Sequence, residues 1–217
     1  MADKSGSPSI IFDFDGTLAD SLLVTLGTLY ELVHHQPMPV QDVSRYRGMS
    51  TIQVLRELKI PLWRALFLKQ KIYSAMRDRM DRIALVPGID EMVRELVKHY
   101  TLYIVSSNDA PNVKVFLGRF QIGAYFAKVY GDANPIGKAK TLRQVLAENH
   151  LDPASTWYVG DQAWDVKAAH RVGMKAAAVG WGFSNLHVLK APNPDLLAFS
   201  PDELTKHFLA LKPPSHV

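Results

Sequence analysis

The apolar positions of this chain follow different patterns in two parts of the sequence. Between residues 19 and 82 they recur at helical spacing, and no strand pattern interrupts them. From residue 83 onward, short apolar runs alternate with helical stretches, which is typical of a parallel sheet covered by helices on both faces. A further short apolar run, at residues 10–12, precedes the insert. We therefore expect an α/β core formed by residues 1–18 and 83–217, and an inserted helical subdomain formed by residues 19–82.

The same patterns predict the individual elements. Strands are expected at residues 10–12, 101–105, 126–130, 156–159 and 175–179, with an edge strand at 194–199. In the insert, helices are expected from residue 22, where Asp20 and Ser21 can act as the cap, at 42–47, from residue 50, and at 62–82. In the core, helices are expected at 89–99, 111–120, 140–150, 165–172 and 201–211.

Composition and charge narrow the class of protein. With 217 residues, 47% of them hydrophobic and 21% charged, the chain can form a soluble globular core. The net charge of +4 is spread along the sequence and forms no basic stripe, so we expect no nucleic-acid partner, although a mild positive field suits an anionic substrate. No apolar run approaches the length of a membrane span, and the polar first nine residues lack the apolar segment of a signal peptide. We expect a cytoplasmic protein that is a monomer or a homodimer. Because the chain has no cysteine, disulfide and thiolate chemistry are excluded.

Polar side chains collect where the predicted strands end, at the edge of the sheet where ligands bind in open α/β folds. They belong to Asp13, Asp15, Ser106, Ser107, Lys138, Lys140, Asp161 and Asp165. Four carboxylates at one edge would repel one another strongly unless a bound cation offset their charge. Hard oxygen ligands together with a lysine indicate Mg²⁺ and a phosphate group.

Four short motifs carry these residues in order along the chain. They are Asp13-Phe14-Asp15-Gly16-Thr17, Val105-Ser106, Gly137-Lys138 and Gly160-Asp161-Gln162-Ala163-Trp164-Asp165. Their order and spacing resemble the haloacid dehalogenase superfamily over about residues 10–205, and the phosphoglycolate-phosphatase-like and β-phosphoglucomutase-like branches in particular. The insert lies between the first two motifs, where this superfamily has its small helical cap. The resemblance implies a Rossmann-like parallel sheet flanked by helices, with an inserted all-helical cap subdomain.

The resemblance also implies a role for each acid. Asp13 would be the nucleophile that attacks phosphorus and forms an aspartyl-phosphate. Asp15 would protonate the leaving oxygen and then accept a proton from the attacking water. Asp13, the main-chain carbonyl of Asp15, and Asp161 would hold Mg²⁺. Asp165 would support the waters of the metal or the lysine, although an acid at this position alone is more often a helix cap.

The remaining motif residues would hold the phosphoryl group. The resemblance implies that Ser106 donates a hydrogen bond to this group and that Lys138 balances its charge. Gly16 would allow the tight turn after the first strand, and Thr17 would help to fix that turn.

Two of these assignments have alternatives. Ser107-Asn108 also resembles the ending of the second motif, so Ser107 is an alternative to Ser106. Lys140 is an alternative to Lys138, because the prolines that many relatives carry after the lysine are missing from this chain.

The acid at position 15 also bears on the reaction. Relatives that cleave carbon–halogen or phosphonate bonds lack an acid there, so the resemblance implies phosphate-ester chemistry and a Mg²⁺-dependent phosphatase of a small phosphorylated metabolite. The segment Arg47-Gly48-Met49-Ser50 resembles the substrate loop of the mutase branch, although Thr51 stands where that branch has a further basic residue. A β-phosphoglucomutase-like phosphotransferase is therefore an alternative, and Arg45 or Arg47 could contact the substrate. The alternative from another class is a non-catalytic protein that binds a phosphorylated ligand or a partner.

Overall fold

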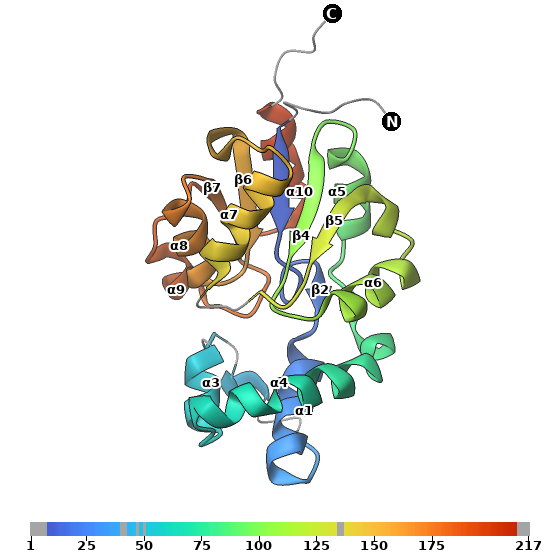
Figure 1. Cartoon of the computed structure of the whole chain (residues 1–217), viewed down its shortest axis with the longest axis vertical. Helices are drawn as coiled ribbons and strands as arrows, with labels where there is room; N and C mark the ends of the chain where they lie inside the picture. The colour runs from blue at the N-terminus through green and yellow to red at the C-terminus, as the bar shows by residue number, and fades with distance from the viewer. Residues whose placement is uncertain (1–7, 40–42, 47, 50, 134–136, 212–217) are drawn as a thin grey trace, which may run out of the picture.

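The central feature of the computed structural model is a six-stranded sheet in the order β5-β4-β1-β6-β7-β8 (Figure 1). Its strands are β1 (Ser9–Phe12), β4 (Thr101–Val105), β5 (Phe126–Tyr130), β6 (Thr156–Gly160), β7 (Lys175–Val179) and β8 (Leu196–Ala198). All neighbouring strands are parallel, and the expected α/β fold class is confirmed. The structure describes residues 8–39, 43–46, 48–49, 51–133 and 137–211.

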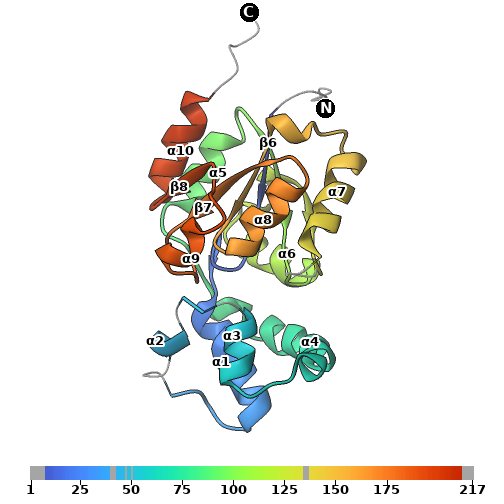
Figure 2. The same ribbon diagram turned by 90° about the vertical axis from the view of Figure 1, so that its left-hand side faces the viewer.

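Helices cover both faces of this sheet (Figure 2). One face carries α5 (Ile89–Leu96), α6 (Ala110–Arg119) and α10 (Pro201–Ala210), and the other carries α7 (Lys138–Glu148), α8 (Ala163–Arg171) and α9 (Leu186–Lys190). The sequence of β1 explains this arrangement. Ile10 and Phe12 belong to the first apolar cluster and Ile11 to the second, and all three are fully buried. Alternate side chains of a strand point to opposite faces, so an unbroken apolar run requires cover on both sides.

The helical insert lies beyond the carboxyl ends of the strands (Figures 1 and 2). It contains α1 (Leu22–His34), α2 (Val43–Tyr46), α3 (Thr51–Glu57), α4 (Leu62–Arg77) and a 3₁₀ turn at Met80–Arg82. Apolar side chains from α1 and from the α3 region, including Leu22, Leu26, Val54 and Leu58, form a cluster separate from the two clusters that flank the sheet. The boundaries of a cap domain at residues 18/19 and 82/83 stay a prediction.

A two-stranded antiparallel ribbon joins the insert to the core. It pairs β2 (Ala19–Asp20) with β3 (Ala84–Leu85), and the Val86 amide donates to the Leu18 carbonyl at 3.0 Å. The expectation that residues 19–82 contain no strand is therefore wrong at residues 19–20. Two residues are too few to establish the alternation that identifies a strand in a sequence.

Other elements differ from their predicted bounds. The helix expected at residues 62–82 ends at Arg77, because Met80 and Ile83 turn into the core as buried members of the first cluster. The short helix α9 was not predicted, since five residues contain little more than one helical turn. The expected helix at 42–47 is present as α2, but residues 42 and 47 lie outside the described residues. Nowhere in the described part of the chain is there a helix both long and apolar enough to span a bilayer.

Phe208 offers a test of the core packing. Its buried ring packs edge-on against Tyr100 and Trp157, with centroid separations of 5.7 and 5.4 Å. Phe208→Ala should lower the free energy of unfolding by about 3–5 kcal/mol in urea titrations. The matched change Phe67→Ala removes a side chain that is 78% exposed and should cost less than about 0.5 kcal/mol. Similar losses in the two variants would contradict the placement of α10 in the core.

Candidate active site

The register of the sheet brings the predicted site residues together. Phe12, the last residue of β1, pairs with Ile104 in β4 and with Val159 in β6. The residues that follow these strands are Asp13, Ser106 and Asp161, so they come side by side at the carboxyl edge. This edge faces the helical insert (Figure 1).

The ammonium group of Lys138 lies between two carboxylates. Its Nζ is 2.8 Å from Oδ2 of Asp13 and 2.5 Å from Oδ1 of Asp165, and the lysine side chain is 1% exposed. Burial by itself lowers the pKa of Lys138, but the charges of Asp13 and Asp165 outweigh it and raise the pKa well above its usual value. The lysine is therefore a fixed positive charge. Lys140, the alternative from the sequence, is exposed.

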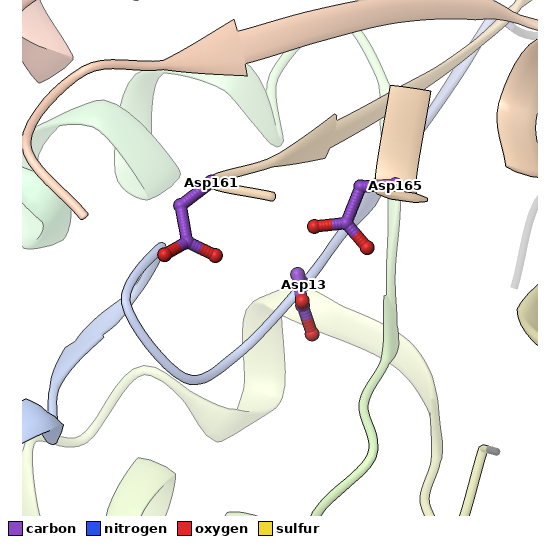
Figure 3. Close-up of side chains that lie close together, drawn as sticks. All are labelled: Asp13, Asp161 and Asp165. Carbon is purple, nitrogen blue, oxygen red and sulfur yellow. The ribbon is translucent and has the colours of Figure 1, made fainter. Parts of the chain in front are cut away.

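Asp161 completes a group of three carboxylates with Asp13 and Asp165 (Figure 3). One oxygen from each lies within 4.8 Å of the others. Oδ2 of Asp161 accepts hydrogen bonds from the amide of Phe183 and the side chain of Gln162, but its buried Oδ1 has no partner. A buried carboxylate oxygen without a donor is costly unless a cation or another donor contacts it. The three side chains could therefore hold a divalent cation.

Burial and mutual repulsion make this group unfavourable when it is fully ionised. Burial, followed by the charges of Asp165 and Asp13, raises the pKa of Asp161 well above its usual value. Burial also raises the pKa of Asp165 to about 7, against the opposing effect of Lys138. One lysine does not offset three carboxylates, which is a second reason to expect a cation here.

Gly16 allows the chain to pass close to Asp161. Its φ of +77° is a backbone conformation that residues with a Cβ rarely adopt, and a Cβ there would overlap the carboxylate of Asp161 and the ring of Phe183. The turn that follows β1 therefore requires glycine. Thr17 is buried in the same turn, and its carbonyl accepts a hydrogen bond from the indole of Trp181 at 3.0 Å.

Asp15 has surroundings that differ from those of the three-carboxylate group. Its Oδ1 accepts a hydrogen bond from Ser21 Oγ at 2.6 Å, and its Oδ2 accepts one from Asn108 Nδ2 at 3.2 Å. Burial is the main reason that its pKa is raised to about 6, and the charge of Asp13 adds to the effect. Ser21 was expected to cap α1, but it makes no side-chain cap hydrogen bond. Its hydroxyl instead donates to Asp15.

A cavity of about 200 Å³ opens next to Asp13 and Asp15. Core residues and residues of α1 and α4 both line it: Asp13, Asp15, Thr25, Ile72, Tyr73, Met76, Ser107, Asn108, Gln162, Trp164 and Phe183. Its position between the core and the insert is suited to a small ligand that contacts both.

The predicted residues of the second motif lie in different positions relative to this cavity. Ser107 and Asn108 are in its lining, whereas Ser106 is fully buried and its Oγ accepts a hydrogen bond from the Asn108 amide at 3.0 Å. Which serine contacts a phosphoryl group stays a prediction. Arg45 forms an ion pair with Glu57 at 2.5 Å, and Arg47 lies outside the described residues.

The sequence analysis named Arg45 and Arg47 as insert residues that could contact the substrate, but it did not identify the insert residues that line the cavity. Thr25, Ile72, Tyr73 and Met76 come from helices whose sequence pattern marks them only as amphipathic. Phe183, in the loop that follows β7, also lines the cavity. No local motif could have identified the insert residues, because they reach the cavity only when α1 and α4 lie against the core.

Comparison with known proteins identifies the family. The family model for haloacid dehalogenase-like hydrolases matches residues 10–179, so the chain belongs to this family. It is 33% identical over 200 residues to a phosphoglycolate phosphatase of Synechococcus elongatus, covering 90% of this chain and 94% of the relative. A pyrophosphatase of Bacillus velezensis is 27% identical, covering 91% of this chain and 94% of the relative.

A solved structure agrees with these matches. A haloacid dehalogenase-like hydrolase of Streptococcus pneumoniae has a TM-score of 0.77 and 25% identity, covering 93% of this chain and 98% of its own. The predicted family and the predicted enzyme class, a phosphatase, are confirmed by the family model and the relatives.

The buried carboxylates predict how the stability of the metal-free protein depends on pH. The folded-state pKa values of Asp15, Asp161 and Asp165 are raised, to about 6 for Asp15 and about 7 for Asp165. The folded protein therefore binds more protons than the unfolded chain, and the stability this gives is lost as the pH rises through the raised values. With EDTA present, the free energy of unfolding should fall as the pH rises from about 5 to 8, by about 1.4 kcal/mol per pH unit for each carboxyl group that is protonated in the folded protein and ionised in the unfolded chain.

Two controls accompany this prediction. Asp165→Asn removes one of the titrating groups and should make the fall smaller. An added divalent cation should do the same, because it favours the ionised carboxylates. Lys138 makes no contribution in this range, since its raised pKa lies above it. Urea titrations that show stability rising with pH would contradict the placement of these acids.

Proposed function

We propose that the protein is a Mg²⁺-dependent phosphatase that hydrolyses a small phosphorylated metabolite through a phosphorylated Asp13. The observation that carries the proposal is that Asp13 and Asp15 line the same cavity in different surroundings: Asp13 is paired with Lys138, whereas Asp15 accepts hydrogen bonds from Ser21 and Asn108. Family membership and the likeness to a phosphoglycolate phosphatase support it.

Asp13, Asp161 and the main-chain carbonyl of Asp15 would hold the Mg²⁺. The unpartnered Oδ1 of Asp161 supports this assignment, because it is a hard oxygen ligand already buried at the site. When bound, Mg²⁺ would offset the negative charge shared by the carboxylates and the phosphoryl group. Asp165 would act indirectly, by holding Lys138 in place.

Asp13 would act as the nucleophile in the first step. One of its carboxylate oxygens attacks phosphorus, the bond from phosphorus to the ester oxygen breaks, and the electron pair stays on the ester oxygen. Lys138 keeps a positive charge beside the reacting carboxylate. In the second step, water attacks the phosphorus of the aspartyl-phosphate, which regenerates Asp13 and releases inorganic phosphate.

Asp15 would transfer the protons in both steps. Its raised pKa of about 6 leaves an appreciable protonated fraction near neutral pH, as a general acid requires. It would give its proton to the leaving oxygen and then take one from the attacking water. Its carboxylate oxygens accept hydrogen bonds from a hydroxyl and an amide, whereas Asp13 is paired with an ammonium group. Two carboxylates in different environments can divide acid and nucleophile roles in this way.

The helical insert would act as a cap that closes over the substrate and excludes bulk water from the site. The cavity that it closes holds about 200 Å³, which supports a small substrate. Phosphoglycolate, named in the Synechococcus relative, is the first ester to test in a panel with sugar phosphates, nucleotides and pyrophosphate. The cytoplasmic location and the monomer or homodimer state expected from the sequence stay predictions.

Turnover of p-nitrophenyl phosphate tests the proposal directly. The protein should hydrolyse it with Mg²⁺ and lose the activity in EDTA. Asp13→Asn should reduce kcat at least about a thousandfold, because the nucleophile is removed while the shape of the side chain is kept. Asp195→Asn is the matched control, since Asp195 is a partly exposed acid that pairs with His170 and does not line the cavity. It should stay within about twofold of wild type. A folded, Mg²⁺-loaded protein without turnover of any ester in the panel would contradict the proposal.

A further inference from the structure

Asn112 lies between the candidate active site and the helical insert. It is fully buried in α6, one turn after the N-cap residue Asp109. Its Nδ2 donates to Asn108 Oδ1 at 3.3 Å and to the main-chain carbonyl of Tyr73 in α4 at 3.0 Å, and its Oδ1 accepts from Nε of Arg77 at 3.3 Å. Both polar atoms of one side-chain amide are therefore committed to contacts that join the core to α4.

Asn108 is the link from Asn112 to the reacting groups. Its Oδ1 accepts from the Asp109 amide at 2.9 Å and from Asn112, while its Nδ2 donates to Oδ2 of Asp15 at 3.2 Å. A carboxamide has a donor end and an acceptor end, and these cannot be exchanged without reversing every hydrogen bond. Two donors directed at Oδ1 hold the amide so that its Nδ2 faces Asp15.

We propose that Asn112 is a positioning residue for proton transfer. It holds the Asn108 amide in the orientation that donates to Asp15, and this orientation depends on the packing of α4 against the core. The inference rests on the proposed function, because it assigns a consequence to the position of Asp15. Asn112 is not among the residues that line the cavity, and its hydrogen bonds go to Asn108, Tyr73 and Arg77, so it acts on Asp15 through Asn108.

The identity of the leaving group separates this role from a general structural one. Proton donation by Asp15 matters most when the ester oxygen leaves as a strongly basic alkoxide. It matters little for 2,4-dinitrophenyl phosphate, whose leaving phenolate is stable without a proton. Loss of Asn112 should therefore lower kcat/KM more for an ester with a more basic leaving group, whereas loose packing would lower kcat/KM alike for the alkyl ester and for 2,4-dinitrophenyl phosphate.

The variant Asn112→Ala tests this with a pair of substrates. For an alkyl phosphate that the wild-type protein hydrolyses, kcat/KM, which reports the steps up to departure of the ester oxygen, should fall about tenfold or more, part of the contribution that a positioned acid makes. For 2,4-dinitrophenyl phosphate, kcat/KM should stay within about threefold, while hydrolysis of the aspartyl-phosphate, which is common to both esters, affects only kcat. Arg119→Met is the matched control, because Arg119 also joins α6 to the end of the insert, but its hydrogen bonds go to the carbonyls of Met80 and Ile83 instead of to Asn108 or Asp15. It should change kcat/KM equally for the two esters.

A second variant and a second background complete the test. Asn112→Asp keeps the shape of the side chain and an acceptor for Arg77 but removes the donor to Asn108, so it should show the same leaving-group effect even where Asn112→Ala folds poorly. In an Asp15→Asn background, Asn112→Ala should cause no further selective loss.

Equal losses for both esters, or an undiminished selective loss without Asp15, would overturn the positioning role while leaving the phosphatase proposal intact. A folded, Mg²⁺-loaded wild-type protein that hydrolyses no ester of the panel and no 2,4-dinitrophenyl phosphate would overturn the proposed function, and the role of Asn112 with it.

Discussion

The site depends on one interaction, the burial of the Lys138 ammonium between Asp13 and Asp165. Two carboxylates and a lysine are removed from water together, which is tolerable only because the charges lie in direct contact. The contact joins the end of β1 to the first turns of α7 and α8. Removal of either acid would leave the buried ammonium group with one carboxylate contact instead of two. Removal of the lysine would leave two buried carboxylates that repel each other. The remaining negative charge on Asp161 is then what makes a bound cation favourable.

A second constraint comes from the position of the insert. The β2–β3 ribbon brings the two connections together beside the turn that carries Asp15 and Gly16, so the insert begins and ends next to the reacting groups. Ser21, the first residue after β2, donates a hydrogen bond to Asp15. At the other end of the insert, α4 contacts α6: the Tyr73 carbonyl accepts from Asn112, and Arg77 pairs with Asp109. Besides lining the cavity, the insert therefore contacts Asp15 directly through Ser21 and indirectly through α6. This arrangement gives it a means to affect proton transfer as well as access of the substrate.

The sequence predicted the sheet and the strand-end residues because both have local signals. The β1 run is apolar on both faces, which identifies it as a buried strand. Each motif stands directly after a strand or at the start of a helix, so its residues lie at the carboxyl edge of the sheet. The roles of Ser21, Tyr73 and Asn112 could not be predicted in this way. Each is an ordinary residue for its local element, a serine before a helix, an aromatic residue on an amphipathic helix and a polar residue in a first turn. Their contacts exist only after the insert and the core have come together.

Trapping of the covalent intermediate tests the central claim most directly. Borohydride reduces an aspartyl-phosphate to homoserine, so the protein can be quenched with borohydride during turnover of a phosphate ester and its peptides sequenced by mass spectrometry. The account predicts homoserine at position 13, dependent on both the ester and Mg²⁺, with Asp15, Asp161 and Asp165 unchanged. Turnover without a trapped group at position 13, or with one at another acid, would contradict the assignment of Asp13 as the nucleophile.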